Sequence, residues 1–446
     1  MRAGRGQSGR MPYARYMTIL VLTVGGSHQP LVTAIQSLKP DRGVFLCSDD
    51  APGTKGSYVQ VMGQGLVIKS NPTLEKPDLP NIVVQTNLAP TQYEIVKIRH
   101  FDNLETCYQE ARNALERLRR DFPAARIIAD YTGGTKSMTA GLAIAAVDFE
   151  WCDLNVVAGT RADLEKVKDR TQFARPVMVW DLRGRRNLEE VQVRLACFDY
   201  AGAASLLETI AGMPISQPFS EKIAVGLAIC RGLDAWDRFD HKGARNLLEP
   251  YRRHLVSECV ILDDLCRTEP RNPYVRSEDL LLNAERRAAQ GRYDDAVARI
   301  YRAIELIAQV RLEKKYGIKT SNVELQKIPE HARASLERYR ADNGEIQIPL
   351  FQAWSLLQEL RDEPLGGWLN ANKSKVKNFL GTRNFSILAH GEKSINEAVY
   401  CSVGRVGLSL CREALATLVT AESRKPLVQQ LPNRLGFLDR DEDETA

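Results

Sequence analysis

The chain has 446 residues, which is enough for two or three domains that each bury a core. Its 61 basic and 56 acidic residues nearly balance, so the charge neither requires nor excludes a nucleic-acid partner. The nine cysteines contain no Cys-x-x-Cys pair and the six histidines form no His-Glu-x-x-His cluster. This pattern excludes a disulfide scaffold, predicts no bound metal and fits a reducing, cytoplasmic location. No apolar run reaches the roughly twenty residues of a membrane span, so we expect no membrane partner.

Strand and helix signals alternate through the first part of the chain, after a basic, glycine-rich stretch at 1–16 that we expect to be a disordered extension. The expected strands are 19–24, 42–50, 81–88, 125–134, 153–159 and 176–182, and the clearest helices are 103–123 and 136–149. Such alternation over 17–184 predicts an α/β, Rossmann-like domain with a parallel, doubly wound sheet. Ligands of such sheets bind at the carboxyl ends of the strands.

The stretch "DYTGGTKSMTAGLAIAA" (130–146) begins with a polar turn between a strand and a helix of small residues. Its two glycines let a ligand approach the backbone amides, the helix N-terminus favours an anion, and the lysine adds a full charge. A Walker A loop is excluded, because Thr135 rather than glycine precedes the lysine and neither residue 129 nor residue 130 is a glycine. The alternative is an ordinary strand-to-helix turn. The candidate anion-binding residues are Thr132, Gly133, Gly134, Thr135 and Lys136.

A weaker turn of the same kind, "VGGSHQPLVTAI", follows the strand at 19–24. Its serine and glutamine offer hydrogen bonds, and its proline suits the first turn of a helix. A single histidine such as His28 is more often structural or solvent-facing. Both turns follow strands of one sheet, so together they can line a polar groove at its edge. The candidate residues of this turn are Gly25, Gly26, Ser27 and Gln29.

Strand signals vanish after residue 183, and helical patterns continue to about residue 423. We expect a helical connector at 185–280, an all-α domain at 281–425 and an acidic tail at 426–446. The helix-turn-helix around Gly291, "AAQGRYDDAVARIYRAIE", slightly resembles a tetratricopeptide unit. No second copy is evident, and one copy does not make a solenoid.

The helical part also contains "GTRNFSILAHGEK" (381–393), in which an arginine and a histidine lie seven residues apart. On one helix, Arg383 and His390 would share a face, and Gly391 would end that helix. The apolar residues expected to pack inward are Phe385, Ile387 and Leu388. Arginine binds phosphate and histidine transfers protons near neutral pH, so the pair suits phosphodiester chemistry. By itself, the spacing better fits an exposed arginine and a helix-end histidine that complements the helix dipole.

A Rossmann-like sheet with "DYTGGTKSMTAGLAIAA", followed by helices with "GRYDDAVARIYRAIE" and "RNFSILAHG", resembles the CARF–HEPN ribonucleases of type III CRISPR systems. CARF is a Rossmann-fold sensor domain, and HEPN is a small helical nuclease domain. The resemblance covers about 17–423. It implies that both glycine turns bind a cyclic oligoadenylate, with cyclic tetra-adenylate favoured over cyclic hexa-adenylate. It also implies that this ligand activates the nuclease and that no cofactor is needed.

The resemblance further implies a homodimer with a composite nuclease site for single-stranded RNA. Cleavage would need no metal: the 2′-OH attacks the adjacent phosphate and leaves a 2′,3′-cyclic phosphate and a 5′-OH. Arg383 would orient the scissile phosphate, His390 would transfer the proton, and Asn384 would support one of them. Arg302 and Glu305 are further supporting candidates, or else an ordinary salt-bridged surface helix.

Two other functions stay open. The chain could be a non-catalytic sensor that binds the cyclic nucleotide and acts through a partner, in which case ligand binding would occur without nuclease activity. The sensor domain could also degrade its own ligand, with Thr132, Thr135 and Lys136 as the candidate residues. A DNA-binding regulator is disfavoured, because no helix-turn-helix with a basic recognition helix stands out.

Overall fold

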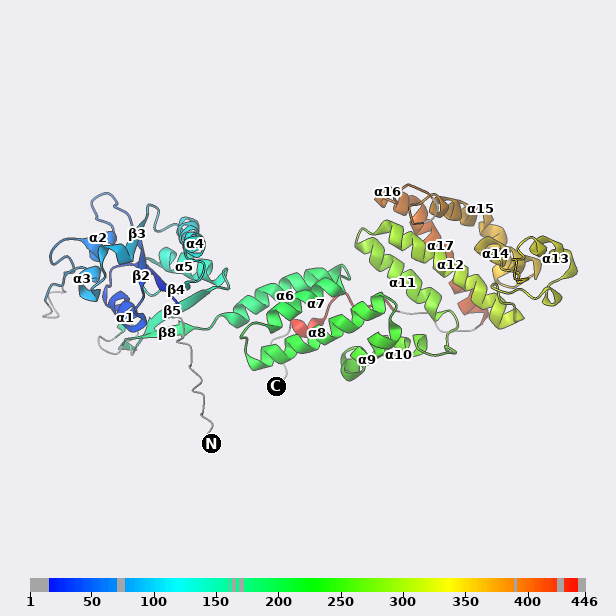
Figure 1. The fold of residues 1–446 in the computed structure, drawn as a ribbon, viewed down its shortest axis with the longest axis horizontal. Coiled ribbons are helices and arrows are strands. Elements are labelled where there is room, and N and C mark those ends of the chain that lie inside the picture. The colour runs from blue at the N-terminus through cyan, green and yellow to red at the C-terminus, as the bar shows by residue number, and fades with distance from the viewer. Residues whose placement is uncertain are drawn as a thin grey trace, which may run out of the picture. The chain divides into compact units, whose positions relative to one another are not determined.

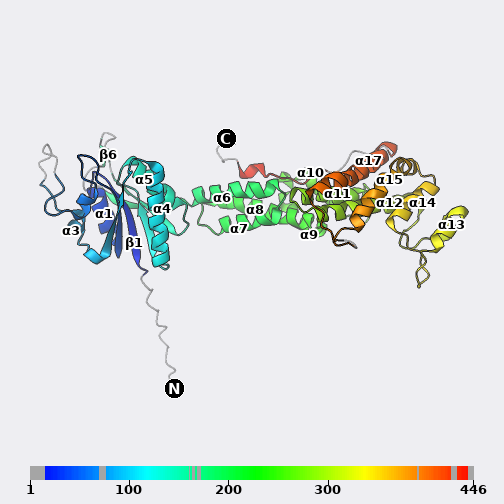
Figure 2. The ribbon, with the colours of Figure 1, turned by 90° about the horizontal axis from the view of Figure 1, so that it is seen from above.

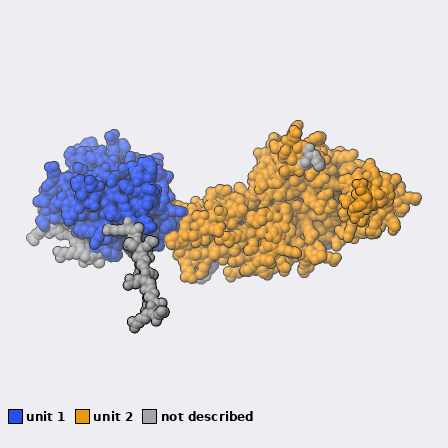
Figure 3. All heavy atoms as spheres, viewed as in Figure 1, with its two compact units in different colours: residues 1–183 blue, residues 184–446 orange. Residues whose placement is uncertain are grey.

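The computed structural model describes residues 16–69, 77–159, 161–162, 166–167, 172–388, 391–422 and 429–439. The chain divides into two compact units, residues 1–183 and 184–446, which Figure 3 colours separately. The first unit is built on a β-sheet and the second on α-helices (Figure 1).

The first unit contains a six-stranded sheet with the order β3-β2-β1-β4-β5-β8. The first five of these strands pair in parallel, and the edge strand β8 runs antiparallel to β5. The central strands are nearly continuous apolar runs, as parallel strands buried on both faces require. The predicted fold class is therefore confirmed. The strands are β1 (Thr18–Val24), β2 (Arg42–Ser48), β3 (Tyr93–Ile98), β4 (Arg126–Asp130), β5 (Cys152–Ala158) and β8 (Phe173–Val177), with a separate pair formed by β6 (Arg161–Ala162) and β7 (Lys166–Val167).

Helices cover both faces of this sheet (Figures 1 and 2). Leu115 of α4 and Leu142 of α5 belong to the hydrophobic core on one face, while Leu31 of α1 and Ile82 of α3 belong to the core on the other face. The strand order reverses between β1 and β4, which is where doubly wound sheets form ligand sites. The helices are α1 (Gln29–Leu38), α2 (Tyr58–Met62), α3 (Ile82–Thr86), α4 (Leu104–Asp121) and α5 (Lys136–Val147).

Two segments differ from the sequence prediction. Residues 81–88, expected as a strand, contain α3, and the third strand of the sheet is β3 instead. The physical reason is capping at both ends: Asn81 Oδ1 accepts the N–H of Val84 at 2.8 Å, and Asn87 ends the helix with a φ of 55°. In the expected strand at 176–182, β8 ends at residue 177 and α6 begins at residue 180.

The second unit has no regular strand among its described residues and folds around two hydrophobic cores. One core gathers side chains from 188–275 and 431–438, and the other gathers side chains from 274–418. The expected division into a connector at 185–280 and a domain at 281–425 stays a prediction, which these two cores support. The helices are α6 (Trp180–Ala196), α7 (Tyr200–Ala211), α8 (Gln217–Asp237), α9 (His241–Leu248), α10 (Val256–Leu265), α11 (Val275–Ala289), α12 (Tyr293–Tyr316), α13 (Glu330–Glu337), α14 (Leu350–Glu359), α15 (Leu365–Asn384), α16 (Glu397–Val399) and α17 (Arg405–Ala421).

Three helix turns in this unit share one geometry. The residue two positions before α7, α9 and α12 has a positive φ: 57° at Phe198, 65° at Phe239 and 72° at Gly291. The N–H of this residue donates to the carbonyl oxygen three residues earlier. The N–H of the following residue donates to the carbonyl oxygen five residues before it, as in a Schellman motif. Each turn is followed by an aromatic residue and, three positions later, by a buried alanine. These pairs are Tyr200 with Ala203, His241 with Ala244 and Tyr293 with Ala296.

The tetratricopeptide-like turn therefore occurs three times, which corrects the expectation of a single copy. The first two copies are hard to see in the sequence because phenylalanine occupies the left-handed position where glycine is usual. Their helices are capped by aspartate: Asp199 accepts the N–H of Gly202 at 3.0 Å, and Asp240 accepts the N–H of Gly243 at 2.9 Å.

Candidate functional site

The two predicted glycine turns lie side by side at one edge of the sheet. They follow β1 and β4, which are neighbouring parallel strands. A Cβ atom on Gly25 would lie 2.6 Å from the backbone nitrogen of Gly134, and a Cβ atom on Gly133 would lie 2.4 Å from the carbonyl oxygen of Thr23. The φ of Gly134 is +94°, which glycine adopts without strain. The structure thus brings the candidate residues of both turns together, and glycine is required where the backbones touch.

Two helices begin at this edge and direct their N-termini toward it. α1 starts at Gln29 and α5 starts at Lys136, both of which are exposed, as are Gly26 and Ser27 in the first turn. The unpaired N–H groups and aligned peptide dipoles at a helix N-terminus favour negative charge. The arrangement is suited to holding phosphate groups, with the Lys136 ammonium as an added charge.

A buried polar pair holds the backbone of the second turn. Asn155 Nδ2 donates to Asp130 Oδ2 at 2.5 Å, and Asp130 Oδ1 accepts the N–H of Thr132 at 3.0 Å. Burial raises the pKa of the Asp130 carboxyl, and the hydrogen bonds from Thr132 and Asn155 oppose that rise. Thr132 Oγ1 in turn accepts the N–H of Val157 at 2.8 Å. The turn is therefore tied to both β4 and β5.

The hydroxyl of Thr135 is used within the fold. It donates to the carbonyl oxygen of Phe101 at 2.7 Å and accepts the N–H of Met138 at 3.3 Å, which caps α5. Its predicted role as a ligand donor stays a prediction, and its observed role is to position the helix. The turn can still offer its backbone amides and the exposed Lys136 side chain to a ligand.

The predicted nuclease pair lies around the end of α15. This helix ends at Asn384, so the prediction that Arg383 and His390 share one helix face is wrong. His390 itself lies outside the described residues. The expected continuation of the helix as far as Gly391 does not form: the N–H groups of Phe385 and Ser386 still bond back to α15, but the N–H of Ile387 bonds forward to Lys393.

The chain folds back on itself after α15. Ile387 N–H donates to the carbonyl oxygen of Lys393 at 2.9 Å, and Gly391 N–H donates to the carbonyl oxygen of Ser386 at 3.1 Å. A Cβ atom on Gly391 would lie 2.0 Å from the carbonyl oxygen of Phe385. Glycine is therefore needed at 391, and that residue is held against the chain at the end of α15.

The apolar residues after Arg383 do not pack inward as expected. Phe385, Ile387 and Leu388 are 73, 53 and 51% exposed, whereas Ser386 is buried. The helical spacing does not apply to them, because the helix has already ended. These three residues, called the 385–388 patch below, form an exposed apolar surface next to Arg383.

Arg383 rests on an aromatic ring. Its guanidinium carbon lies 4.1 Å from the centre of the Tyr301 ring on α12, and its Nη1 donates to Asn384 Oδ1 at 3.3 Å. Burial raises the pKa of the Tyr301 hydroxyl, the Glu305 carboxylate adds to the rise, and Arg383 opposes it. A guanidinium stacked on a ring keeps its planar N–H fork available for a phosphate. Sequence reasoning missed Tyr301, because no local spacing reveals a contact between residues so far apart in the chain.

The other two supporting candidates pair with each other. Arg302 Nη1 lies 2.5 Å from Glu305 Oε2 and donates to Gln309 Oε1 at 3.0 Å. Arg302 is exposed, and pairs of this kind contribute little to stability. The geometry is that of the salt-bridged surface helix considered as the alternative.

No group of three or more His, Cys, Asp or Glu side chains within the described residues is arranged to hold a metal ion. The helices of the described part include none that is both long and apolar enough to cross a bilayer.

Comparisons with known proteins address both units. Residues 267–413 match the model of the Csm6 HEPN domain. The chain also has the fold of Enterococcus italicus Csm6 in complex with cyclic hexa-2'-fluoro-hexa-dAMP, with a TM-score of 0.57 and 14% sequence identity over 95% of this chain and 97% of that chain. No curated protein matches the chain. Residues 267–413 thus match the Csm6 HEPN domain and the whole chain has the fold of a Csm6, which agrees with the expected CARF–HEPN architecture.

Proposed function

We propose that the protein is a metal-independent endoribonuclease that cuts single-stranded RNA when a cyclic oligoadenylate binds its first unit. The observation that carries this proposal is the position of Arg383. It lies within the segment that matches the Csm6 HEPN model, and its guanidinium is seated on the Tyr301 ring at the end of α15. Phosphodiester cleavage requires such a cation at the phosphate that reacts.

The cleavage step uses the RNA's own 2′-OH. The 2′-oxygen attacks the adjacent phosphorus while the bond from phosphorus to the 5′-oxygen breaks, which yields a 2′,3′-cyclic phosphate and a 5′-OH. Arg383 holds the phosphate oxygens and stabilises the charge that develops on them. His390 is the proposed proton-transfer residue, because imidazole titrates near neutral pH, and Asn384 orients Arg383 through its hydrogen bond.

The activator is proposed to bind the two glycine turns. The backbone amides of Gly25, Gly26 and Gly134 and the N-termini of α1 and α5 would hold its phosphates, with Lys136 as the charged contact. Cyclic tetra-adenylate remains the first candidate. The Csm6 of the same fold is bound to a cyclic ligand of six nucleotides, so cyclic hexa-adenylate is the second candidate.

A homodimer would bring two nuclease segments together. The 385–388 patch exposes three large apolar side chains directly after Arg383, and such a surface favours contact with another protein surface. A second copy of the chain would cover this patch and place two Arg383 side chains at one composite site, as an interface with two-fold symmetry requires.

Alanine variants at the nuclease residues test the proposal. Arg383→Ala and His390→Ala should abolish RNA cleavage and leave the affinity for the cyclic oligoadenylate unchanged. Arg340→Ala is the control, because Arg340 is another arginine of this unit but is exposed and forms an ordinary ion pair with Glu337. Cleavage that survives Arg383→Ala would refute the assignment. Ligand binding by a wild-type chain that cuts no RNA under any condition would favour a regulator that acts through a partner.

A further inference from the structure

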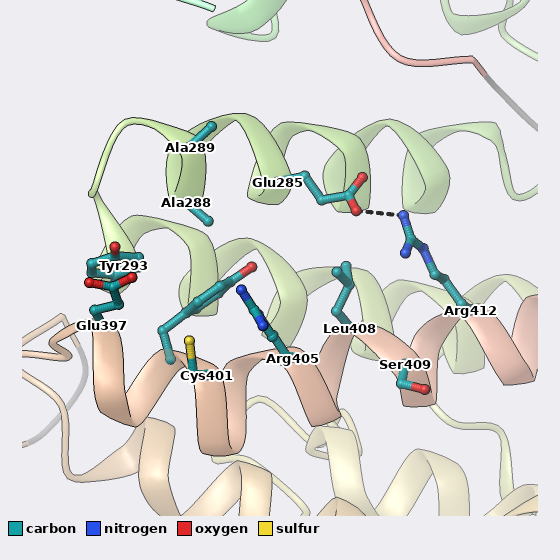
Figure 4. Close-up of a pocket in the computed structure, with 11 residues that line it drawn as sticks. Glu285, Ala288, Ala289, Tyr293, Glu397, Cys401, Arg405, Leu408, Ser409 and Arg412 are labelled. Atoms are coloured by element: carbon teal, nitrogen blue, oxygen red, sulfur yellow. Dashed lines mark hydrogen bonds and ion pairs between the residues drawn. The ribbon is translucent and has the colours of Figure 1, made fainter. Parts of the chain in front are cut away.

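A groove with a volume of about 540 Å³ lies between α11 and α17 in the second unit (Figure 4). Both helices flank α12, which contributes Tyr293 to the lining. On the α11 side, the small side chains of Ala288 and Ala289 leave the groove open. This volume is within the usual range of small-ligand sites and exceeds that of one nucleotide.

The two ends of the groove differ. At one end, Arg412 of α17 reaches across to Glu285 of α11, and the ion pair of 2.5 Å spans the groove (Figure 4). At the other end lie the Tyr293 ring and the exposed Glu397 carboxylate (Figure 4), and among the described residues no ion pair crosses the groove there. A chain-like ligand can therefore enter or leave the groove at the Tyr293 end.

The Tyr293 end adjoins the candidate nuclease segment. Asp294, the next residue after Tyr293, accepts the N–H of Ile395 with both carboxylate oxygens at 3.0 Å. Ile395 closely follows the folded-back segment that begins after Arg383. The same helix, α12, also carries Tyr301, on which Arg383 rests. The groove and Arg383 therefore share one supporting helix, α12.

The wall of the groove is built around an irregular helix. Residues Tyr400–Gly404 form a π-helix, a rare element that is frequent at functional sites. A Cβ atom on Gly404 would lie 2.4 Å from the Tyr400 ring, so this ring lies directly over the glycine. The Tyr400 and Tyr293 rings lie 5.2 Å apart. The two rings thus form the aromatic end of the groove.

Arg405 supplies the charge. It extends from α17 into the groove, it is exposed, and within the described residues it forms no hydrogen bond or ion pair through its side chain (Figure 4). Arg412, by contrast, is already neutralised by Glu285. A guanidinium without a carboxylate partner, in a groove that also carries the half-buried Tyr293 ring at one end, matches the phosphate and base of a single-stranded nucleotide.

We infer that this groove is a substrate subsite that binds RNA next to the scissile position. Arg405 contacts one phosphate and the Tyr293 ring packs against a base. The inference rests on the proposed ribonuclease function and names the part of the surface that holds the strand. One phosphate contact at an exposed arginine contributes to substrate affinity and leaves the chemical step unchanged.

The test compares the full-length wild-type protein with Arg405→Ala in activator-saturated cleavage of a fluorescent single-stranded RNA. KM should rise about tenfold, as the loss of one charge-assisted contact predicts, and kcat should stay within about twofold. The negative slope of log(kcat/KM) against log[salt] should become shallower by about 0.7. The matched control is Lys242→Ala, which removes an exposed cation from another groove of similar volume, about 510 Å³, and should leave KM unchanged.

A KM that is unchanged in Arg405→Ala, or that rises equally in Lys242→Ala, would overturn the inference while the ribonuclease function stands. If Arg405→Ala changes the oligomeric state in sedimentation but leaves KM unchanged, the groove would be assigned to contact with a second copy of the chain instead. If the wild-type protein cuts no RNA, the proposed function fails. In that case RNA binding tests the groove separately: the affinity for labelled RNA is measured by fluorescence anisotropy for Arg383→Ala and for Arg383→Ala/Arg405→Ala. Equal affinities of the two variants would refute the role of the groove.

Discussion

Replacing Tyr301 by leucine removes the ring beneath Arg383 and keeps an apolar side chain against the core. The ring is half-buried and lies 4.1 Å from the guanidinium carbon, and Arg383 is itself only partly exposed. A cation–π contact contributes about 0.5–1 kcal/mol at exposed sites and about 2 kcal/mol when desolvated. The intermediate exposure places this contact at about 1–2 kcal/mol. If Tyr301 positions Arg383 for the reaction, kcat/KM for RNA should fall by about 5- to 30-fold.

The control is Tyr301→Phe, which keeps the ring and removes the hydroxyl. Its kcat/KM should stay within about twofold of the wild-type value, because the face of the ring interacts with the cation. The assay is activator-saturated cleavage of fluorescent RNA, with thermal unfolding of each variant to correct for lost packing. Wild-type kcat/KM in a normally folded Tyr301→Leu protein would refute the positioning role. An equal loss in Tyr301→Phe would assign the effect to the hydroxyl instead of the ring.

Three further substitutions test other parts of the structure. Gly134→Ala places a methyl at a φ of +94° and 2.9 Å from Thr23 Cβ, so cyclic oligoadenylate affinity measured by calorimetry should fall at least about tenfold. Arg183→Met removes a buried guanidinium that donates to five carbonyl oxygens, so denaturant unfolding should show a loss of at least about 3 kcal/mol. Gly391→Ala forces a methyl onto the Phe385 carbonyl oxygen, so RNA cleavage should be lost while activator affinity is retained. Unchanged values would contradict each prediction.

The first unit is largely readable from the sequence, because regular alternation of strands and helices determines a parallel sheet and the edge at which its turns meet. The exceptions are local. Residues 81–88 have the composition of a strand, yet capping by Asn81 and Asn87 encloses a short helix. The support of the second glycine turn by Asp130 and Asn155 could not be predicted, because it depends on which strands become neighbours.

The second unit shows where local spacing fails. Arg383 and His390 fit a helical period, but the chain leaves the helix at Asn384, and a fold-back closed by backbone bonds within 386–393 is not encoded in that spacing. The repeated turns were hidden because Phe198 and Phe239 take a left-handed conformation in which glycine is expected. The groove beside Arg405 is lined by two segments far apart in the sequence, 285–293 and 397–412, so only tertiary packing reveals it.

The central claim is that a cyclic oligoadenylate activates a metal-independent ribonuclease. The most direct measurement incubates the purified full-length protein with a fluorophore–quencher RNA in EDTA, in separate wells with cyclic tetra-adenylate, cyclic hexa-adenylate, linear oligoadenylate or no ligand. We predict that fluorescence rises with one cyclic ligand only, and fastest with the tetra-adenylate. No rise in any well, with ligand binding confirmed by calorimetry, would contradict the claim and favour a sensor that acts through a partner.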